Sequence, residues 1–503
     1  METFQQLLMG FHVAATPFNL LLCFLGCVIG TIIGALPGIG PAAGLSILLP
    51  LTFGMNPTSG MIMMAGLYCG TMYGGTITSV LINVPGEAAS VMTCLDGYQM
   101  ALQGRAGKAL GIAAIGSFIA GTASVVFLML LALPMVKFAL SFGPPEYFAL
   151  MLMGLCTVAG LTSGSVLKAL AGTCLGILVA TPGMDAFSGL PRLTFGLTGL
   201  LGGIDFVVVA VGLFGIGEVL YNVEQSMEMK FLIEKISIKE VWPNRAEWRA
   251  SVGPITRGTL IGFLVGVLPG AGGTIATFLS YAVEKRVSKH PEQFGKGAIE
   301  GVAAPEAANN ASTGGAMVPL LTLGIPGSGT TAIMLGALMM YGLQPGPLLF
   351  LKNPDFVWGV IASMYIGNVM LVIMNMACIP LFVKICKIPN YFLMPFVIVF
   401  ATVGVYSVDG NIFDVWMLYV FGVMGYFMNK FGMPRAPVLL AVVLGPMVER
   451  ALRQSLILSQ GSYDIFFTRP ISAVLLMMGL AAVLWPVFDM IWQRRRARRM
   501  AGA

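Results

Sequence analysis

The sequence predicts an all-α polytopic membrane protein, made of two homologous repeats with broken or re-entrant helices that meet near the bilayer midplane. Three observations predict this class. The 503 residues are 57% hydrophobic and only 10% charged, too little polar surface for a soluble chain of this size. Apolar stretches of bilayer-spanning length recur along the chain. Each half also carries the same two Pro-Gly breaks in the same order.

Four of the longest apolar stretches cover residues 18–36, 110–136, 356–383 and 471–490. Each is long enough to cross a hydrocarbon core ~30 Å thick as a helix. None alternates apolar and polar residues as barrel strands do. Basic residues gather in loops and in the tail RRRARR, so we expect a cytoplasmic C-terminus.

A charged segment near the middle of the chain divides it into two similar parts. We therefore expect a first transmembrane repeat (1–221), a charged cytoplasmic connector (222–257), a second transmembrane repeat (258–493) and a basic cytoplasmic tail (494–503).

Glycines recur at every fourth position before the first break of each half. The two sets are Gly26, Gly30, Gly34 and Gly38 with Pro37, and Gly258, Gly262, Gly266 and Gly270 with Pro269. Further on, YGGTITSVLINVPGEAAS matches TGGAMVPLLTLGIPGSGTT. Glycine is abundant, so chance recurrence is the alternative, but order, proline position and spacing coincide and indicate duplication. For Gly26, Gly30, Gly258 and Gly262 we expect close helix packing.

The four breaks are Pro37-Gly38, Pro85-Gly86, Pro269-Gly270 and Pro326-Gly327. Proline removes a backbone donor and glycine permits positive φ, so a helix stops there. Within a bilayer such breaks persist only inside protein or beside a water-filled cavity. Half-helix N-termini attract anions and C-termini attract cations. By length, residues 258–283 fit a re-entrant hairpin or one tilted crossing, and their charged flanks favour the hairpin.

The breaks and the polar residues around them supply the candidate site. The expected substrate-binding residues are Pro37, Gly38, Gly40, Pro85, Gly86, Ser90, Pro269, Gly270, Pro326, Gly327, Ser328, Thr330 and Thr331. The candidate sodium ligands are Asn83, Asn309, Asn310, Ser312 and Thr313. Glu87 and Glu306 are candidate coupling residues, since carboxylates within membrane segments are costly. Alternatively, Glu87 caps the next half-helix and Glu306 is an interfacial cap.

Enzyme signatures are poor in this sequence. Only His12 and His290 are present, and HExxH, GxSxG and GxxxxGK[ST] are absent. We therefore expect no enzyme activity, no cofactor and no nucleic-acid partner, with lipid as the surroundings. Active transport would then depend on a Na+ or H+ gradient. A passive channel for small anions is the main alternative, followed by an intramembrane enzyme.

Three long motifs carry a family resemblance: GTIIGALPGIGPAAGLSILLPLTF, YGGTITSVLINVPGEAASVMTCLDGYQMALQGRAGKALG, and EGVAAPEAANNASTGGAMVPLLTLGIPGSGTTAIMLGALMMYGLQPGP. Together they resemble the large membrane subunit of the bacterial tripartite tricarboxylate transporters, the TctA family, across roughly residues 20–480. The resemblance implies a secondary transporter of the bacterial cytoplasmic (inner) membrane. It also implies a small membrane subunit of about four helices and a periplasmic solute-binding protein that delivers a carboxylate such as citrate, with sodium or protons driving import.

Overall fold

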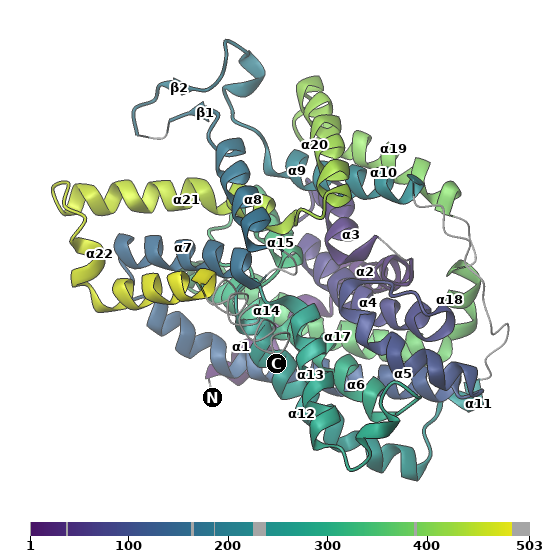
Figure 1. Ribbon diagram of the computed structural model, residues 1–503. Coiled ribbons are helices and arrows are strands. Elements are labelled where there is room, and N and C mark those ends of the chain that lie inside the picture. The colour runs from purple at the N-terminus through teal and green to yellow at the C-terminus, as the bar shows by residue number, and fades with distance from the viewer. Residues whose placement is uncertain are drawn as a thin grey trace, which may run out of the picture.

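The computed structural model describes residues 2–36, 39–161, 165–185, 187–224, 238–386 and 390–484. Helices make up nearly all of its regular structure, and one short antiparallel pair joins β1 (Gly183–Met184) to β2 (Pro191–Arg192) (Figure 1). Within these residues, six helical segments are long and apolar enough to cross a membrane. They are α2 (Pro17–Ala35), α6 (Ala106–Ala139), Phe206–Glu224, α12 (Arg245–Val267), α17 (Pro354–Ala377) and α20 (Ile412–Lys430). The chain is thus an all-α polytopic membrane protein, as predicted.

The remaining elements are shorter or less apolar. Before the connector they are α1 (Glu2–Ala14), α3 (Gly40–Leu48), η1 (Leu49–Thr52), α4 (Pro57–Ile82), η2 (Ala88–Ser90), α5 (Val91–Leu102), α7 (Pro144–Leu161), α8 (Val166–Val179) and η3 (Thr198–Leu200). The span Phe206–Glu224 named above consists of α9 (Phe206–Ala210), η4 (Val211–Ile216) and α10 (Gly217–Glu224).

After the connector they are α11 (Ile238–Val241), α13 (Gly272–Val287), η5 (Pro291–Gln293), α14 (Glu300–Leu323), α15 (Gly329–Met340), α16 (Pro347–Lys352), α18 (Ile379–Cys386), α19 (Asn390–Asp409), α21 (Ala436–Leu458) and α22 (Ile465–Thr468). A final helix covers Pro470–Leu484.

The predicted spans match the observed helices in part. Stretches 18–36 and 110–136 coincide largely with α2 and α6, whereas 356–383 covers most of α17 and continues into the separate helix α18. Residues 485–490 of the fourth stretch, the end of the second repeat and the basic tail lie outside the described residues. The predicted boundary at 257 falls inside α12, because Asn244 caps that helix by accepting the Ala246 and Glu247 N–H groups at 2.9 Å.

The predicted close packing of the glycine rows is confirmed for α2 and α4. The two helices run in the same direction, and a Cβ on any of three α2 glycines would lie less than 3.0 Å from an α4 carbonyl oxygen. The pairs are Gly26 with Met63, Gly30 with Leu67 and Gly34 with Thr71. Only glycine allows the two backbones this separation.

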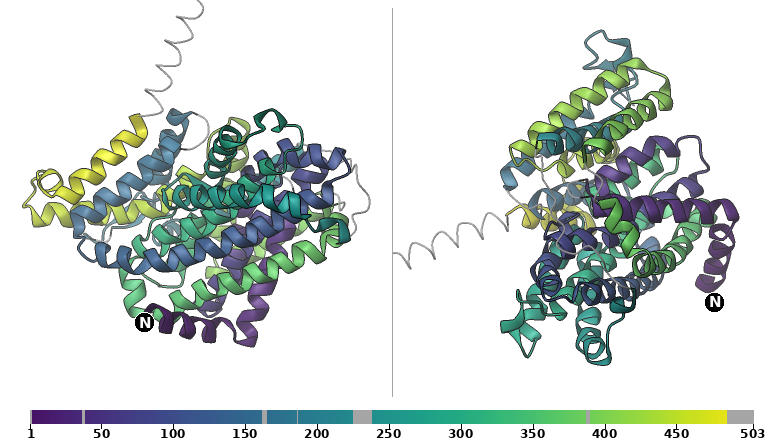
Figure 2. Two further views of the ribbon diagram at one scale, coloured as in Figure 1. Left: turned by 90° about the horizontal axis from the view of Figure 1, so that it is seen from below. Right: turned by 90° about the vertical axis from the view of Figure 1, so that its right-hand side faces the viewer.

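The same packing joins α12 to α14. Here the pairs are Gly258 with Ala304, Gly262 with Ala308 and Gly266 with Ser312, again through carbonyl oxygens. On the outside of the bundle, the N-terminal helix α1 lies along α17, with Gly10 against the Trp358 carbonyl (Figure 2).

The two parallel pairs meet through α4 and α14, which lie at the centre of the molecule (Figure 1). Thr76 of α4 donates a hydrogen bond to Glu306 of α14, and a Cβ on Gly97 would lie 2.9 Å from Val80, later in α4, and 3.7 Å from Val302, earlier in α14. Residue numbers fall along one helix as they rise along the other, so α4 and α14 are antiparallel. The C-terminal ends of α4 and α14, which the Pro-Gly breaks follow, therefore point in opposite directions.

Candidate functional site

Helices α12 and α13 are the two arms of an antiparallel pair joined by the break at Pro269-Gly270. Arg257 on α12 donates two hydrogen bonds to the Glu284 carboxylate on α13, at 2.9 and 2.7 Å. At the turn, Gly270 has a φ of +81° and its N–H donates to the Gly327 carbonyl at 2.9 Å. The third break is thus fastened to the fourth.

The fourth break connects α14 to α15. Helix α14 ends at Gly324, with a φ of +71°, and Pro326 and Gly327 that follow are buried. Ser328 caps α15, because its Oγ accepts the Thr331 N–H at 3.2 Å while Thr331 Oγ1 accepts the Ser328 N–H at 2.8 Å. The N-terminus of α15 is therefore fixed in place by the break itself.

The second break, after α4, has the same outline. Asn83 ends α4 with a φ of +58°, and the backbone of buried Gly86 lies against the Gly34 carbonyl, with no room for a Cβ. Glu87 then occupies the cap position before η2, and Ser90 Oγ donates to its carbonyl at 2.9 Å. Of the first break, Pro37 and Gly38 lie outside the described residues, and Gly40 begins α3 with a φ of +64°.

Three helix N-termini converge near the middle of α14. A Cβ on Gly273, at the start of α13, would lie 3.4 Å from the Ala89 Cβ of η2, 3.0 Å from Asn309 Oδ1 and 3.1 Å from Ser312 Oγ. A Cβ on neighbouring Gly272 would lie 3.7 Å from the Ser328 Cβ, at the start of α15. We call the following set the tip cluster: residues 86–90, 270–273, Asn309, Ser312, Gly327 and Ser328.

Helix N-termini present unpaired N–H groups and a partial positive charge. The tip cluster contains three of them, those of η2 with α5, of α13 and of α15. The contacts that define it involve no lysine or arginine. Chemically, the arrangement suits an anion held by backbone N–H groups, hydroxyls and amides. Glu87 is the one ionisable side chain in the cluster, so an anion there requires its carboxyl group to be protonated or neutralised by a cation.

Two buried carboxylates lie in and beside the tip cluster. Glu87, 6% exposed, accepts a hydrogen bond from Asn309 Nδ2 at 2.7 Å. Glu306, 1% exposed, accepts from Thr76 Oγ1 at 2.7 Å and from Thr93 Oγ1. Within the described structure neither forms an ion pair. Glu306 lies inside α14, so its alternative role as an interfacial cap is wrong, whereas Glu87 does hold a cap position.

The candidate sodium ligands divide into two groups. Asn309 and Ser312 belong to the tip cluster, and the buried Asn309 Oδ1 has no hydrogen-bond partner. Asn310 instead donates to Ser117 Oγ at 2.6 Å, and Thr313 donates to the Asn310 carbonyl at 2.7 Å. Asn83 is exposed at the end of α4. A buried acceptor without a donor is uncommon, and it indicates a place for a further ligand.

Some of the predicted substrate-binding residues lie in the tip cluster, and others lie beside it or away from it. Gly86, Ser90, Gly270, Gly327 and Ser328 belong to the tip cluster. Pro85, Pro269 and Pro326 flank it along the chain, while Thr330 and Thr331 lie in the first turn of α15. Gly40 starts α3, and nothing lies within 4 Å of its would-be Cβ.

The sequence reasoning missed the buried carboxylate of Asp96. Asp96 Oδ1 accepts three backbone N–H groups, those of Gly295, Gly297 and Ala298, at 2.8–2.9 Å, and Oδ2 accepts the Tyr281 hydroxyl at 2.9 Å. It fastens α5 to the loop that leads into α14. The signal was available, because Asp96 follows apolar residues in VMTCLDGYQM and the argument applied to Glu306 applies equally to it.

The fold and the tip cluster define the class: a multi-pass helical membrane protein whose helices break around a buried polar site. The chain belongs to the tripartite tricarboxylate transporter TctA family, whose model matches residues 20–440. It is thus a subunit of a tripartite tricarboxylate transporter and a member of a transporter family. The family assignment expected from the motifs is confirmed.

Two relatives come from Agrobacterium vitis. The chain is 46% identical over 495 residues, 98% of each protein, to an uncharacterized 52.8 kDa protein in the TAR-I ttuC' 3'region. It is 47% identical over 234 residues to an uncharacterized protein in the TAR-II ttuC' 3'region, which covers 46% of this chain and 97% of that relative. No solved structure matches the chain.

Proposed function

We propose that this protein is the ion-gradient-driven transport subunit that imports a small carboxylate across the bacterial cytoplasmic membrane. The substrate is a tricarboxylate such as citrate, or a related di- or monocarboxylate. A periplasmic solute-binding protein delivers it, a small membrane subunit of about four helices completes the complex, and the C-terminus is cytoplasmic. Membership of a tripartite transporter family supports the partners.

One observation carries this proposal: three helix N-termini converge at the tip cluster without a basic side chain. A carboxylate bound there would receive hydrogen bonds from N–H groups at the positive ends of helices. Because no fixed cation neutralises the bound charge, a cation that travels with the substrate would strengthen binding. Symport follows from that requirement.

Sodium and protons both find suitable groups nearby. Asn309 Oδ1 is buried without a donor, and Ser312 Oγ lies close by, so two neutral oxygens are available to a sodium ion. Glu87 and Glu306 are able to carry a proton, since neither has a basic partner in the described structure. The oxygen of Asn309 favours sodium as the first choice.

The contacts also support two inverted repeats. The glycine pairs between α2 and α4 correspond to those between α12 and α14 with a constant offset on each helix. Gly86 touches the Gly34 carbonyl as Gly327 approaches that of Gly266, and Asn83 and Gly324 both end their helices with positive φ. Since α4 and α14 are antiparallel, the repeats we propose have opposite orientations. The hairpins α2–α3 and α12–α13 would then re-enter the membrane from opposite sides.

The test is uptake by the complete three-component system in proteoliposomes. We expect radiolabelled citrate, or another member of a di- and tricarboxylate panel, to accumulate under an imposed Na+ or H+ gradient and to stop accumulating when an ionophore dissipates that gradient. Conductance that is independent of any gradient would instead establish a channel. Release of a chemically altered product would establish an enzyme.

A further inference from the structure

A second place where an anion could bind lies away from the tip cluster. A cavity of about 650 Å³ opens between α7, α15, α16 and α21. This volume is within the range of small-molecule sites. Most of its lining is apolar, and its polar side chains are those of Tyr147, Gln344, Gln454 and Arg450. Arg450 is the only lysine, arginine, aspartate or glutamate in that lining.

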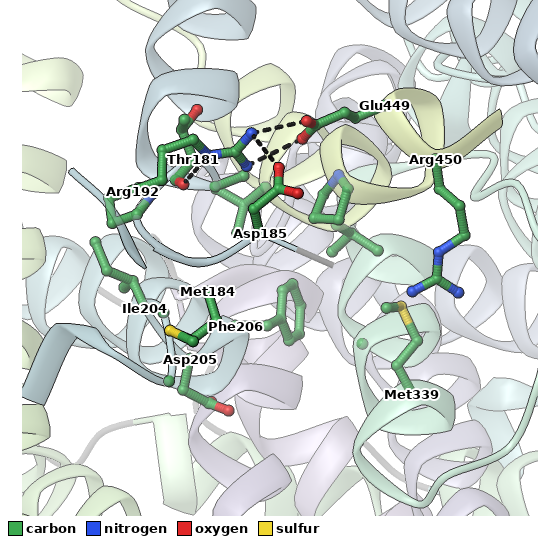
Figure 3. A pocket seen from close by; sticks show the side chains of 18 of the residues that line it. Thr181, Met184, Asp185, Arg192, Ile204, Asp205, Phe206, Met339, Glu449 and Arg450 are labelled. Carbon is green, nitrogen blue, oxygen red and sulfur yellow. Dashed lines mark hydrogen bonds and ion pairs between the residues drawn. The ribbon is translucent and has the colours of Figure 1, made fainter. Parts of the chain in front are cut away.

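Arg450 has no carboxylate partner among the described residues, although acidic groups are close. Its neighbour in sequence, Glu449, accepts from Arg192 at 2.7 and 3.0 Å and pairs with Arg453. Figure 3 shows the Arg450 guanidinium beside Met339, apart from the Arg192–Glu449 pair. On the opposite side, Glu146 is occupied by Arg469 and by the Gly143 N–H. The charge of Arg450 is therefore left for a ligand.

A second cavity, of about 390 Å³, shares Met339, Pro446 and Arg450 with the first, and Figure 3 shows its lining. Three acidic residues, Asp185, Glu449 and Asp205, line it together with two arginines, Arg192 and Arg450. Asp185 pairs with Arg192 and Arg453, and the N–H groups of Phe187 and Ser188 together with Arg453 lower its pKa, so it remains ionised. Arg192 is paired with Asp185 and Glu449, so acidic groups outnumber unpaired basic ones in the second cavity. The larger cavity has no acidic residue in its lining and therefore suits an anion better.

The larger cavity adjoins the fourth break. Its wall includes Leu323, the last residue of α14, and Met151 on α7. One turn further along α7, Gly154 lies against Ile325 of the break, with its would-be Cβ 3.1 Å from the Ile325 side chain. Helix α21 begins beside the same break, where Ala436 contacts Gly329, and Arg450 follows roughly 20 Å along that helix.

We propose that this cavity is a vestibule site in which Arg450 binds one carboxylate group of the transported di- or tricarboxylate before it reaches the tip cluster. The inference rests on the proposed function and deepens it. Guanidinium and carboxylate form paired hydrogen bonds, and the amides of Gln344 and Gln454 offer donors and acceptors for the substrate's remaining polar groups. A lipid phosphate is the competing occupant, but the closeness of the break favours the substrate.

The first experiment measures citrate uptake kinetics of Arg450→Ala, Arg450→Lys and, as a matched exposed arginine, Arg249→Ala in the complete complex. Removing a charge-assisted hydrogen bond from an entry site is expected to raise KM about tenfold or more and to leave kcat within about twofold. Arg450→Lys should fall between the wild type and Arg450→Ala, and Arg249→Ala should match the wild type. An unchanged KM in Arg450→Ala would overturn the inference.

The second experiment reads binding without transport. In Arg450→Cys, citrate should slow labelling of the introduced thiol by an anionic thiosulfonate, and it should not slow labelling of the thiol in the control variant Arg249→Cys, at an exposed position. If labelling changes with anionic lipid content and not with citrate, a lipid occupies the cavity and the inference fails. If the wild type accumulates no carboxylate, the proposed function is contradicted. If the wild type takes up citrate normally but citrate does not slow labelling of Arg450→Cys, only the vestibule site is contradicted.

Discussion

At the residue scale, the structure separates two asparagines that the sequence treats alike. Both Asn83 and Asn309 are candidate sodium ligands near a Pro-Gly break. Asn309 is buried, holds Glu87 through Nδ2 and has a free Oδ1, whereas Asn83 is exposed at a helix end. Burial and contact across the molecule are what distinguish them, and neither is visible in a single sequence.

We therefore predict that Asn309→Ala raises the sodium concentration needed for half-maximal citrate uptake about tenfold. The substitution removes both a buried oxygen ligand and the hydrogen bond to Glu87. Asn83→Ala should leave that concentration unchanged. The measurement is uptake rate against sodium concentration in proteoliposomes, at saturating citrate. Equal sodium dependence in both variants would place the ion elsewhere.

Several contacts at this scale were beyond prediction. Glu306 was identified because a carboxylate in an apolar segment is costly. Its partners, Thr76 and Thr93, come from two other helices, and the ring of N–H groups around Asp96 comes from a distant loop. Such pairings depend on how the helices pack, which spacing along the chain does not determine.

At the element scale, the glycine rows fix the separation of α2 from α4 and of α12 from α14. The four-residue spacing predicted that packing, because it places small residues on one helix face. It did not identify the partner helices or their parallel direction. It also misplaced the start of α12, since the charges of the connector hid the capping signal at Asn244.

These rows make a prediction about stability. Gly30→Ala should destabilise the folded protein by about 1–3 kcal/mol, because the new methyl group would overlap the Leu67 carbonyl and force the helices apart. Gly202→Ala is the control, since nothing lies within 4 Å of its would-be Cβ. The check is thermal unfolding of the detergent-purified protein, where only Gly30→Ala should lower the midpoint.

At the scale of the whole molecule, the two halves of the chain interlock. Tyr73 hydrogen-bonds to Asn368 at 2.8 Å, Tyr281 to Asp96 at 2.9 Å, and α1 packs on α17. The sequence predicted the membrane class and the duplication motifs. It did not show whether the two halves pack against each other, because contacts between helices far apart in the chain leave no trace in composition or in hydrophobic periodicity.

Interlocking predicts the outcome of cutting the chain between residues 224 and 238. If a protease site is inserted there and cleaved after folding, the two fragments should co-elute in mild detergent and retain citrate uptake in proteoliposomes. Contacts between buried helices are expected to hold them without the covalent link. Elution of two separate fragments under the same conditions would show that the connector is needed for assembly.

The two breaks that follow α4 and α14 share their backbone course but not their side chains. One places a carboxylate, Glu87, against the Asn309 amide, and the other places a hydroxyl, Ser328, against the hydroxyl of Thr331. A protein with exact two-fold symmetry in the membrane plane would present identical sites to the two sides of the membrane. If the halves are the inverted repeats we propose, an asymmetry between the two sides of the membrane would arise at positions where the repeats differ. These two contacts are the first such positions to test.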